Sequence, residues 1–356
     1  MKRYVIQGIS LFIAFLLVLN VNQSGFSALN DYKTAVQSEP AFLSADTLWV
    51  DSVLNSLNLE EKIAQLIMIP AYSYMGEEHI KSIRQLIQKY NIGGIIFMKG
   101  SPVRQAQMTS HFQSIAKTPI MVAMDAEWGL GMRLDSVITY PWQMMLGAIQ
   151  DESLIYQMGF DIGTQLRRLG VHINFAPVVD INNNPDNPVI NSRSFGEDRE
   201  NVARKALMYS QGLEDAGVIA TLKHFPGHGD TDVDSHYSLP VIKHNKERLD
   251  SLELFPFEYG IRKGAQAIMS AHLNVLNLDS TQNLASSLSS KVIKDLLLNI
   301  MDFKGLVFTD ALNMKAVSNF YKPGEQEILA FNAGNDILLM PVDAQKAILS
   351  IKKEIK

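Results

Sequence analysis

The chain has 356 residues, of which 47% are hydrophobic and 19% are charged, a composition typical of folded globular proteins. Its 37 Asp and Glu outnumber its 32 Lys and Arg, and no basic run occurs. A nucleic acid is therefore not expected as a partner, because phosphate neutralisation needs clustered cations. The absence of cysteine excludes disulfides, a thiol nucleophile and a lipid-modified cysteine anchor.

Residues 1–28 have the pattern of an export signal. Lys2 and Arg3 precede the apolar run 9–19, and small residues ending at Ala28 offer a cleavage site. The apolar run is shorter than the roughly 20 residues that a membrane span needs. We therefore expect export to the periplasm or the exterior of a bacterium, with no stable membrane span in the mature chain. The alternative is that the segment stays uncleaved as an N-terminal anchor.

Residues 29–45 are polar and lack periodicity, so they are interpreted as a linker, and residues 46–356 as one domain. Eight short runs in this domain are apolar nearly throughout, which is typical of parallel strands buried on both faces. These runs are 65–70, 93–98, 119–124, 173–179, 218–224, 267–272, 305–310 and 336–340.

Helical patterns alternate with the apolar runs. Ile80, Ile83 and Ile87 recur at helical spacing, and residues 344–355 read as a closing helix. This alternation predicts an α/β fold, a single (β/α)₈ barrel of the TIM type. A doubly wound open sheet is the alternative, but no GxGxxG motif follows an early strand.

The active site of a (β/α)₈ barrel lies at the C-terminal ends of its strands, so polar residues at those ends carry functional weight. Strands three to seven all end in or next to charged or titratable side chains. These are Asp125, Asp180, Lys223 with His224, His272 and Asp310.

The segment 223–236, KHFPGHGDTDVDSH, holds three His and three Asp, and its glycines favour a loop. One interpretation is a metal site, for which imidazole and carboxylate groups suit zinc. Its ligands would be His224, His228, Asp232 and His236. A second is a solvated loop that caps its own backbone. A third is acid/base chemistry, in which Asp234 orients the imidazole of His236 and raises its pKa.

Asp310 follows an apolar strand, so its carboxylate is expected to face a largely desolvated barrel mouth. Neighbours such as Lys223 and Arg193 would have to stabilise the charge, or the pKa of Asp310 would rise. A carboxylate nucleophile opposite a proton donor is the arrangement of a retaining glycosidase. The alternative for an aspartate at this place is an N-cap of the next helix.

The loop KHFPGHGDTDVDSH resembles that of glycoside hydrolase family 3, specifically its β-N-acetylhexosaminidase branch. The motifs MDAEWGLGMR, INFAPVVDI, NSRSFGED and VFTDALNM follow in the expected order, and the resemblance spans roughly residues 46–350. It implies Asp310 as the nucleophile and His236, assisted by Asp234, as the general acid/base. It also implies that five residues surround the sugar: Asp125, Arg133, Arg193, Lys223 and His224.

The resemblance implies a retaining exo-β-N-acetylglucosaminidase without cofactor or metal. Its partner would be a carbohydrate, an N-acetylglucosamine-terminated glycan or a peptidoglycan fragment. Two departures stand out: Trp128 replaces the first Gly of the commoner EGG motif, and Ala311 stands where branch members often have Asp.

Three other functions stay open at this point. They are a family 3 β-glucosidase or xylosidase, an N-acetylglucosaminide phosphorylase, and a non-catalytic sugar-binding barrel. Family β-glucosidases tend to take their acid/base from a second domain, and its absence favours the one-domain hexosaminidase type.

Overall fold

The computed structural model describes residues 37–355 except residue 236. The expected export signal, residues 1–28, and the first part of the expected linker therefore lie outside the described residues, as does His236. Within the described part of the chain, no helix is both long and apolar enough to cross a membrane.

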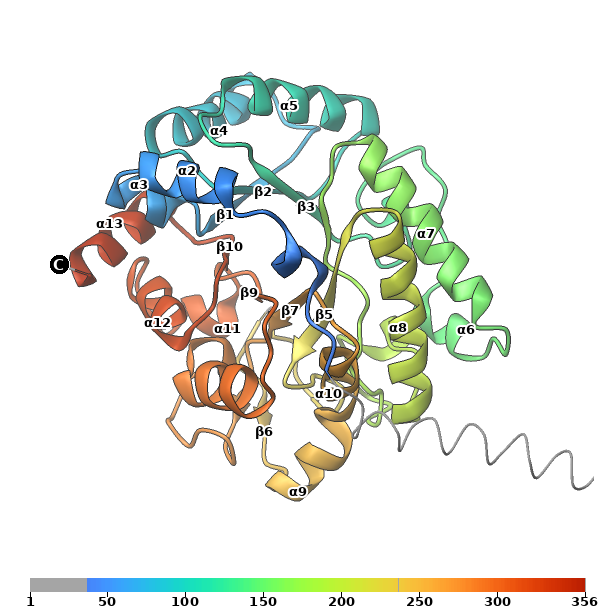
Figure 1. The fold of residues 1–356 in the computed structure, drawn as a ribbon. Coiled ribbons are helices and arrows are strands. Elements are labelled where there is room, and N and C mark those ends of the chain that lie inside the picture. Colours follow the sequence, from blue (N-terminus) through green and yellow to red (C-terminus); the bar gives the residue numbers. More distant parts are fainter. Residues whose placement is uncertain (1–36, 236, 356) are drawn as a thin grey trace, which may run out of the picture.

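Eight parallel strands form one sheet in the order β10-β1-β2-β3-β4-β5-β7-β9. The sheet curls round on itself, since Phe308 of β9 pairs with Ile337 just before β10. The fold is thus the predicted (β/α)₈ barrel, and each strand lies within or overlaps one of the eight apolar runs (Figure 1). The strands are β1 (Ile67–Ala71), β2 (Gly94–Phe97), β3 (Met121–Met124), β4 (Ile173–Asn174), β5 (Ile219–Phe225), β7 (Ala267–Ser270), β9 (Leu306–Thr309) and β10 (Leu338–Leu339), with β6 (Val241–Ile242) and β8 (Asn274–Val275) forming a separate parallel pair.

Strand β4 is shorter than the predicted run 173–179. Pro177 has no backbone N–H to donate, and pairing resumes only as a single bridge between Val178 and Lys223. The next residue, Val179, donates its backbone N–H to the carbonyl of Lys223 at 2.8 Å. The polar residues after β4 are therefore still held beside the end of β5.

Helices lie outside the sheet and cover it with their apolar faces. In α4 the buried residues Ile83, Ile87 and Tyr90 recur at the spacing of one helical face, as predicted. The α-helices are α2 (Leu48–Ser56), α3 (Leu59–Ala64), α4 (Glu77–Tyr90), α5 (Pro102–Ile115), α6 (Gln143–Gly147), α7 (Ser153–Arg168), α8 (Arg199–Asp215), α9 (Lys246–Arg248), α10 (Phe255–Arg262), α11 (Lys315–Ser318), α12 (Glu325–Ala333) and α13 (Ala344–Glu354). The 3₁₀ helices are η1 (Ala41–Ser44), η2 (Leu130–Met132), η3 (Asn191–Arg193) and η5 (Ser286–Leu288), and η4 (Leu249–Glu253) and η6 (Lys291–Ile300) have π-type hydrogen bonds.

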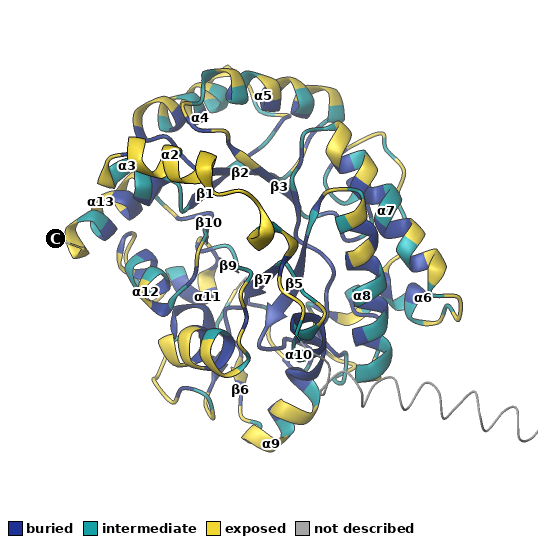
Figure 2. Cartoon of the chain, viewed as in Figure 1, coloured by how far each residue is buried: buried dark blue, intermediate teal, exposed yellow. Residues whose placement is uncertain are grey.

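Two hydrophobic clusters hold the barrel together. The smaller one fills its interior, where Phe175 and Phe308 meet edge to face with ring centroids 5.2 Å apart. The larger one lies between the outer face of the strands and the helices. Figure 2 accordingly shows the strands almost entirely in the colour of buried residues and the helices exposed on one side. The helices and strands are therefore fixed mainly by apolar burial.

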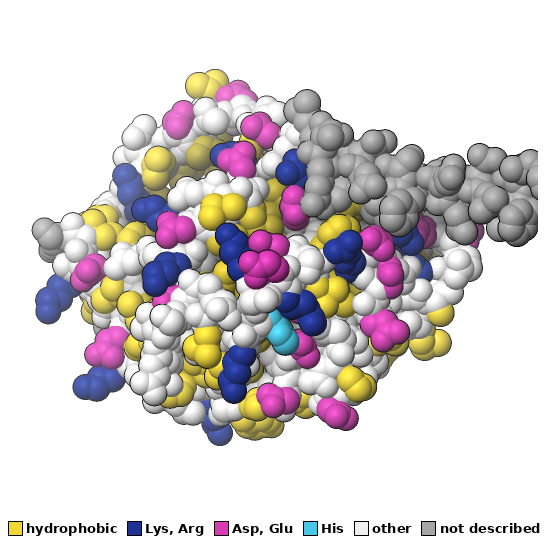
Figure 3. Space-filling model, turned by 90° about the horizontal axis from the view of Figure 1, so that it is seen from below, with side chains coloured by type: hydrophobic (Ala, Val, Ile, Leu, Met, Phe, Trp, Pro, Cys, Tyr) yellow, Lys and Arg dark blue, Asp and Glu magenta, His cyan; other side chains and the backbone are white. Residues whose placement is uncertain are grey.

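The two mouths of the barrel differ. Residues 37–47 run across the N-terminal mouth, where the backbone N–H of Ser38 donates to the carbonyl of Arg262, just before β7 (Figure 1). This stretch of the expected linker includes the helix η1. The polar strand ends lie at the opposite mouth. On the face seen in Figure 3, acidic and basic side chains are interspersed and do not form single-sign patches.

Candidate active site

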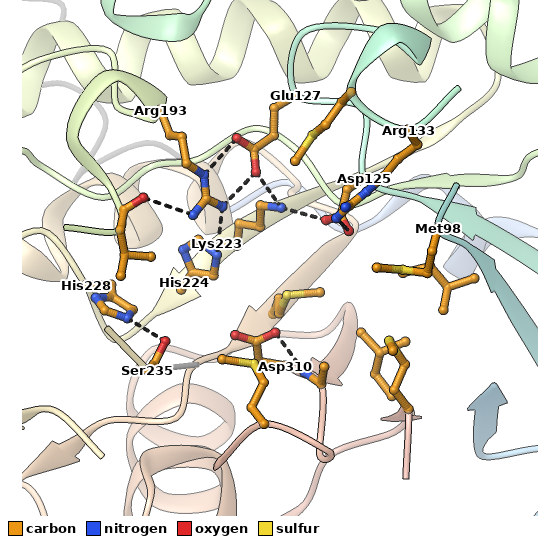
Figure 4. A pocket seen from close by; sticks show the side chains of 18 of the residues that line it. Met98, Asp125, Glu127, Arg133, Arg193, Lys223, His224, His228, Ser235 and Asp310 are labelled. Carbon is orange, nitrogen blue, oxygen red and sulfur yellow. Dashed lines mark hydrogen bonds and ion pairs between the residues drawn. The ribbon is translucent and has the colours of Figure 1, made fainter. Parts of the chain in front are cut away.

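A cavity of about 390 Å³ opens at the C-terminal ends of the strands, a size within the usual range of small-ligand pockets. It brings together six of the predicted site residues (Figure 4): Asp125, Arg133, Arg193, Lys223, His224 and Asp310. Glu127, Trp128, His228 and Ser235 also line it. The ends of strands three, five and seven therefore converge on one cavity, whereas Asp180 and His272 are buried and do not line it.

Lys223, at the end of β5, lies between two carboxylates that follow β3. Its Nζ is 2.9 Å from Oδ1 of Asp125 and 2.9 Å from Oε1 of Glu127. Arg133 also donates to Asp125. Arg193 donates from Nη2 and Nε to the two oxygens of Glu127, at 2.7 and 3.0 Å. Alternating charges thus form one continuous network along this wall (Figure 4).

The network keeps both carboxylates ionised. Burial by itself raises the pKa of Asp125, but the charges of Lys223 and Arg133 outweigh it and hold this pKa well below its ordinary value. For Glu127, burial is likewise outweighed, here by Arg193 and Lys223, and its pKa falls to about 2. At neutral pH the wall therefore presents fixed acceptors and donors of the kind that sugar hydroxyl groups need.

Asp180, which follows β4, organises the start of the loop after β5. Its buried carboxylate is 2.7 Å from Nδ1 of His224 and accepts the backbone N–H of His228 at 2.7 Å. Nε2 of His224 lies 3.4 Å from Nη2 of Arg193. Burial lowers the pKa of His228 to about 4, helped by the nearby His224, so His228 is neutral at pH 7. Asp180 thus orients the ring of His224, which lines the cavity.

Asp310 lies across the cavity from the charged wall, at the end of β9 (Figure 4). One of its carboxylate oxygens accepts the backbone N–H of Ala311 at 2.7 Å. Burial by itself raises the pKa of Asp310, but His272, His224 and the Ala311 amide together bring the pKa below its usual range. The N-cap alternative is wrong, because helix α11 begins after Met314 and has no side-chain cap. Asp310 is therefore an ionised carboxylate facing a cavity.

Apart from Asn313, the rest of the cavity wall is apolar and rich in methionine. Flexible thioether side chains fill irregular gaps and give a soft surface next to the polar wall. The apolar lining residues are Ile96, Met98, Met132, Val189, Met269, Ala311, Met314, Leu339 and Met340. A ligand in this cavity therefore meets apolar side chains as well as the charged wall and Asp310.

The loop after β5 carries the predicted acid/base pair. Ser235 lines the cavity, and its Oγ lies 3.1 Å from Nε2 of His228. Asp234 is half-buried and has an interaction partner. His236, the next residue after Ser235, lies outside the described residues, so its role stays a prediction. His224 at the start of the loop and Ser235 near its end thus line the same cavity.

Two of the histidines that the metal interpretation of this loop would use have protein partners. His224 bonds with Asp180, and His228 lies 2.8 Å from Thr231 Oγ1. Among the described residues, one group of three metal-ligating side chains does form where Asp230 of the loop meets His244 and Glu253. Arg248 forms ion pairs with both of those carboxylates, at 3.4 and 3.2 Å. We interpret this cluster as an ion-pair network that secures the loop to η4.

Two important residues were missed by sequence reasoning. Glu127 is fully buried and pairs with both Arg193 and Lys223, yet the sequence shows only an acidic residue two positions after Asp125. Asp180 was noticed as a strand end but not as a site residue. A signal was present for both, since a carboxylate at the end of a buried strand needs donors or cations nearby.

The fold and this cavity define a (β/α)₈-barrel protein with a charged cavity of small-ligand size at the C-terminal ends of its strands. Within that class the chain belongs to glycosyl hydrolase family 3. Its residues 58–356 match the family model described as "Glycosyl hydrolase family 3 N terminal domain". The resemblance found in the sequence is thus confirmed.

Proteins similar to this chain are described as beta-hexosaminidases or as a beta-N-acetylglucosaminidase. Beta-hexosaminidase A of Pseudoalteromonas piscicida is 34% identical over 80% of this chain and 54% of its own length. Beta-hexosaminidase LpqI of Mycobacterium tuberculosis is 32% identical over 80% of this chain and 73% of its own. A solved family 3 beta-N-acetylglucosaminidase from Paenibacillus sp. is 40% identical with a TM-score of 0.78, and the match covers 83% of this chain and 57% of that one. The chain thus spans little more than half of the first and the last of these proteins.

Proposed function

We propose that the chain is a retaining exo-β-N-acetylglucosaminidase that removes terminal β-linked N-acetylglucosamine. The observation that carries the proposal is the ionised Asp310 carboxylate facing a charged wall across one cavity. The similarity to beta-hexosaminidases and to a beta-N-acetylglucosaminidase supports the choice of sugar. Glycoside hydrolysis with retention needs a carboxylate nucleophile and a proton donor on opposite sides of the scissile bond.

The first step would be attack of an Asp310 oxygen on the anomeric carbon. The bond from that carbon to the departing oxygen breaks, and His236 transfers its proton to this oxygen. Asp310 suits the task because it is ionised, and the amide of Ala311 holds one of its oxygens in place. The product of this step is a glycosyl-aspartate and a free alcohol.

In the second step a water molecule would attack the same carbon while His236 takes its proton. The bond to Asp310 breaks, the carboxylate is regenerated, and the sugar leaves with its configuration retained. Asp234 would orient the imidazole and support its positive charge. The position of Ser235 on the cavity wall supports this role for the loop.

The charged wall would bind the hydroxyl groups of the sugar. Asp125 can accept hydrogen bonds, while Lys223, Arg133 and Arg193 can donate them, and their mutual ion pairs keep these groups in position before the sugar arrives. His224, oriented by Asp180, adds a further polar contact. Such preorganisation lets binding energy be used in the transition state.

We further infer that the reaction takes place outside the cytoplasm. The sequence pattern of residues 1–28 supports export to the periplasm or the exterior. An N-acetylglucosamine-terminated glycan or a peptidoglycan fragment would then be the natural substrate. Wall turnover or scavenging outside the cytoplasm would be the corresponding role.

The experiment compares the purified chain with its Asp310→Asn variant on an aryl β-N-acetylglucosaminide and an aryl β-glucoside. We expect the wild type to prefer the first substrate and the variant to lose nearly all turnover. A fluorinated sugar should label Asp310, which a non-catalytic sugar-binding barrel would not allow. A preference for the glucoside would favour a β-glucosidase, and release of sugar phosphate in phosphate buffer would favour a phosphorylase.

A further inference from the structure

Two of the three tryptophans in the chain stack on one another beside the cavity. The indole rings of Trp128 and Trp142 are 4.5 Å apart between centroids and 7° from parallel. Trp128 lines the cavity, directly after Glu127. Trp142 is 41% exposed. The pair is therefore an aromatic stack, with Trp128 at the cavity wall and Trp142 at the solvent.

The pair is held at the same mouth of the barrel as the charged wall. Gln143 follows Trp142 directly. Its side-chain amide donates to the carbonyl of Val178 and accepts the backbone N–H of Val178, two residues before Asp180. Helix α6, which begins at Gln143, packs against η3, the short helix that ends at Arg193. The backbone N–H of Tyr140 also donates to the carbonyl of Trp128 at 3.0 Å.

An exposed tryptophan beside a cavity indicates a binding surface for a ligand. A large apolar side chain left in water costs free energy, and exposed apolar groups beside a cavity mark binding surfaces. The flat face of an indole ring carries partial negative charge, which attracts the polarised C–H groups on the face of a pyranose ring. A phosphate or a free carboxylate would gain nothing from this surface.

From these observations we propose that Trp128 and Trp142 form a binding site for the second sugar of the substrate, the pyranose that is released. This inference rests on the proposed function, since it assumes that the terminal sugar occupies the cavity. The sugar beyond the scissile bond would leave the cavity along the tryptophan pair and stack on it. The preferred substrates would then be β-linked disaccharides and longer glycans, rather than simple alkyl or peptide conjugates of N-acetylglucosamine.

Binding to the Asp310→Asn variant tests the inference without turnover. N-acetylglucosamine and its β-1,4-linked dimer would be titrated by calorimetry, with and without Trp142→Ala. We expect Trp142→Ala to weaken binding of the dimer about three- to tenfold, the effect of one aromatic stacking contact, and to leave binding of the monosaccharide unchanged. Trp142→Phe keeps a flat ring and should restore most of the loss. Met145, an exposed apolar residue of α6 close to Trp142 in the chain, gives the matched control: Met145→Ala should change neither affinity.

Fluorescence gives a second readout. Replacing the remote Trp49 by Phe leaves Trp128 and Trp142 as the only tryptophans, and we expect the dimer to shift their emission more than the monosaccharide does. Equal effects of Trp142→Ala on both sugars, or no effect on either, would overturn the inference while the proposed function stands. Failure of both sugars to bind the otherwise unchanged Asp310→Asn chain would instead contradict the proposed function.

Discussion

The ammonium group of Lys223 lies 2.9 Å from Oδ1 of Asp125, although 98 residues separate them in the chain. The two side chains come from β5 and from the end of β3, and both are largely buried. The same ammonium group also contacts Glu127. Lys223 is thus the cation that joins the two carboxylates of the site.

Replacing Lys223 with Met should destabilise the fold and nearly abolish activity. Asp125 and Glu127 would each keep one arginine, so we expect a loss of about 2 kcal/mol, less than the roughly 3–5 kcal/mol of a fully broken buried pair. Urea unfolding measures the loss. The exposed Lys243, changed to Met in the same way, should alter stability by less than about 0.5 kcal/mol. Equal stability of both variants would contradict the structural role of Lys223.

The pKa of Glu127 predicts a pH dependence of stability. Its pKa is about 2 in the folded chain and 4.5 as the ordinary value, so folding favours the ionised form. The stabilisation is fully present above pH 4.5 and is lost as the pH falls towards 2. For a fully buried group this shift corresponds to about 3 kcal/mol.

The check compares wild type with Glu127→Gln by denaturant unfolding between pH 7 and the lowest pH at which both still fold. The neutral amide does not titrate, so the variant should lose less stability than the wild type below pH 4.5. Parallel pH profiles would show that Glu127 does not carry this dependence.

Gly229 lies in the loop after β5 and closely against Ile181, in the segment that follows β4. A Cβ atom built at this position would lie 1.7 Å from the carbonyl oxygen of Ile181, so the backbone of one of the two segments would have to move. We expect Gly229→Ala to cost about 1–3 kcal/mol of stability, as overpacking does, and to reduce turnover through the displaced loop. Gly76→Ala is the matched control, since nothing lies within 4 Å of its Cβ. Normal turnover and stability of Gly229→Ala would count against a close-packed loop.

Replacing His236 with Ala should affect substrates unequally if this residue is the acid. Poor leaving groups need a proton as they depart, whereas a good leaving group such as dinitrophenolate does not. We therefore expect a loss of at least about 100-fold on alkyl or sugar leaving groups and a much smaller loss in the first step on activated aryl ones. Pre-steady-state measurement of aryl release separates that step from hydrolysis of the intermediate. A uniform loss across leaving groups would argue against the acid role.

The barrel and much of its rim could be predicted from local patterns along the chain. Short apolar runs are a local property, so β5 and β9 could be recognised without knowing their neighbours. Because parallel strands of a barrel all end at one mouth, Lys223 and Asp310 were assigned to the same cavity from their strand ends alone. That assignment is confirmed.

Which side chains meet could not be predicted in this way and is seen only in the folded chain. Nothing local distinguishes the buried Glu127 from an exposed glutamate, because its burial depends on Arg193, 66 residues away, reaching back across the mouth. The stacking of Trp128 on Trp142 likewise depends on how α6 packs against η3. Contacts between loops arise from closure of the barrel and from the packing of loops against one another. Because neither depends on the periodicity of the chain, periodicity cannot predict these contacts.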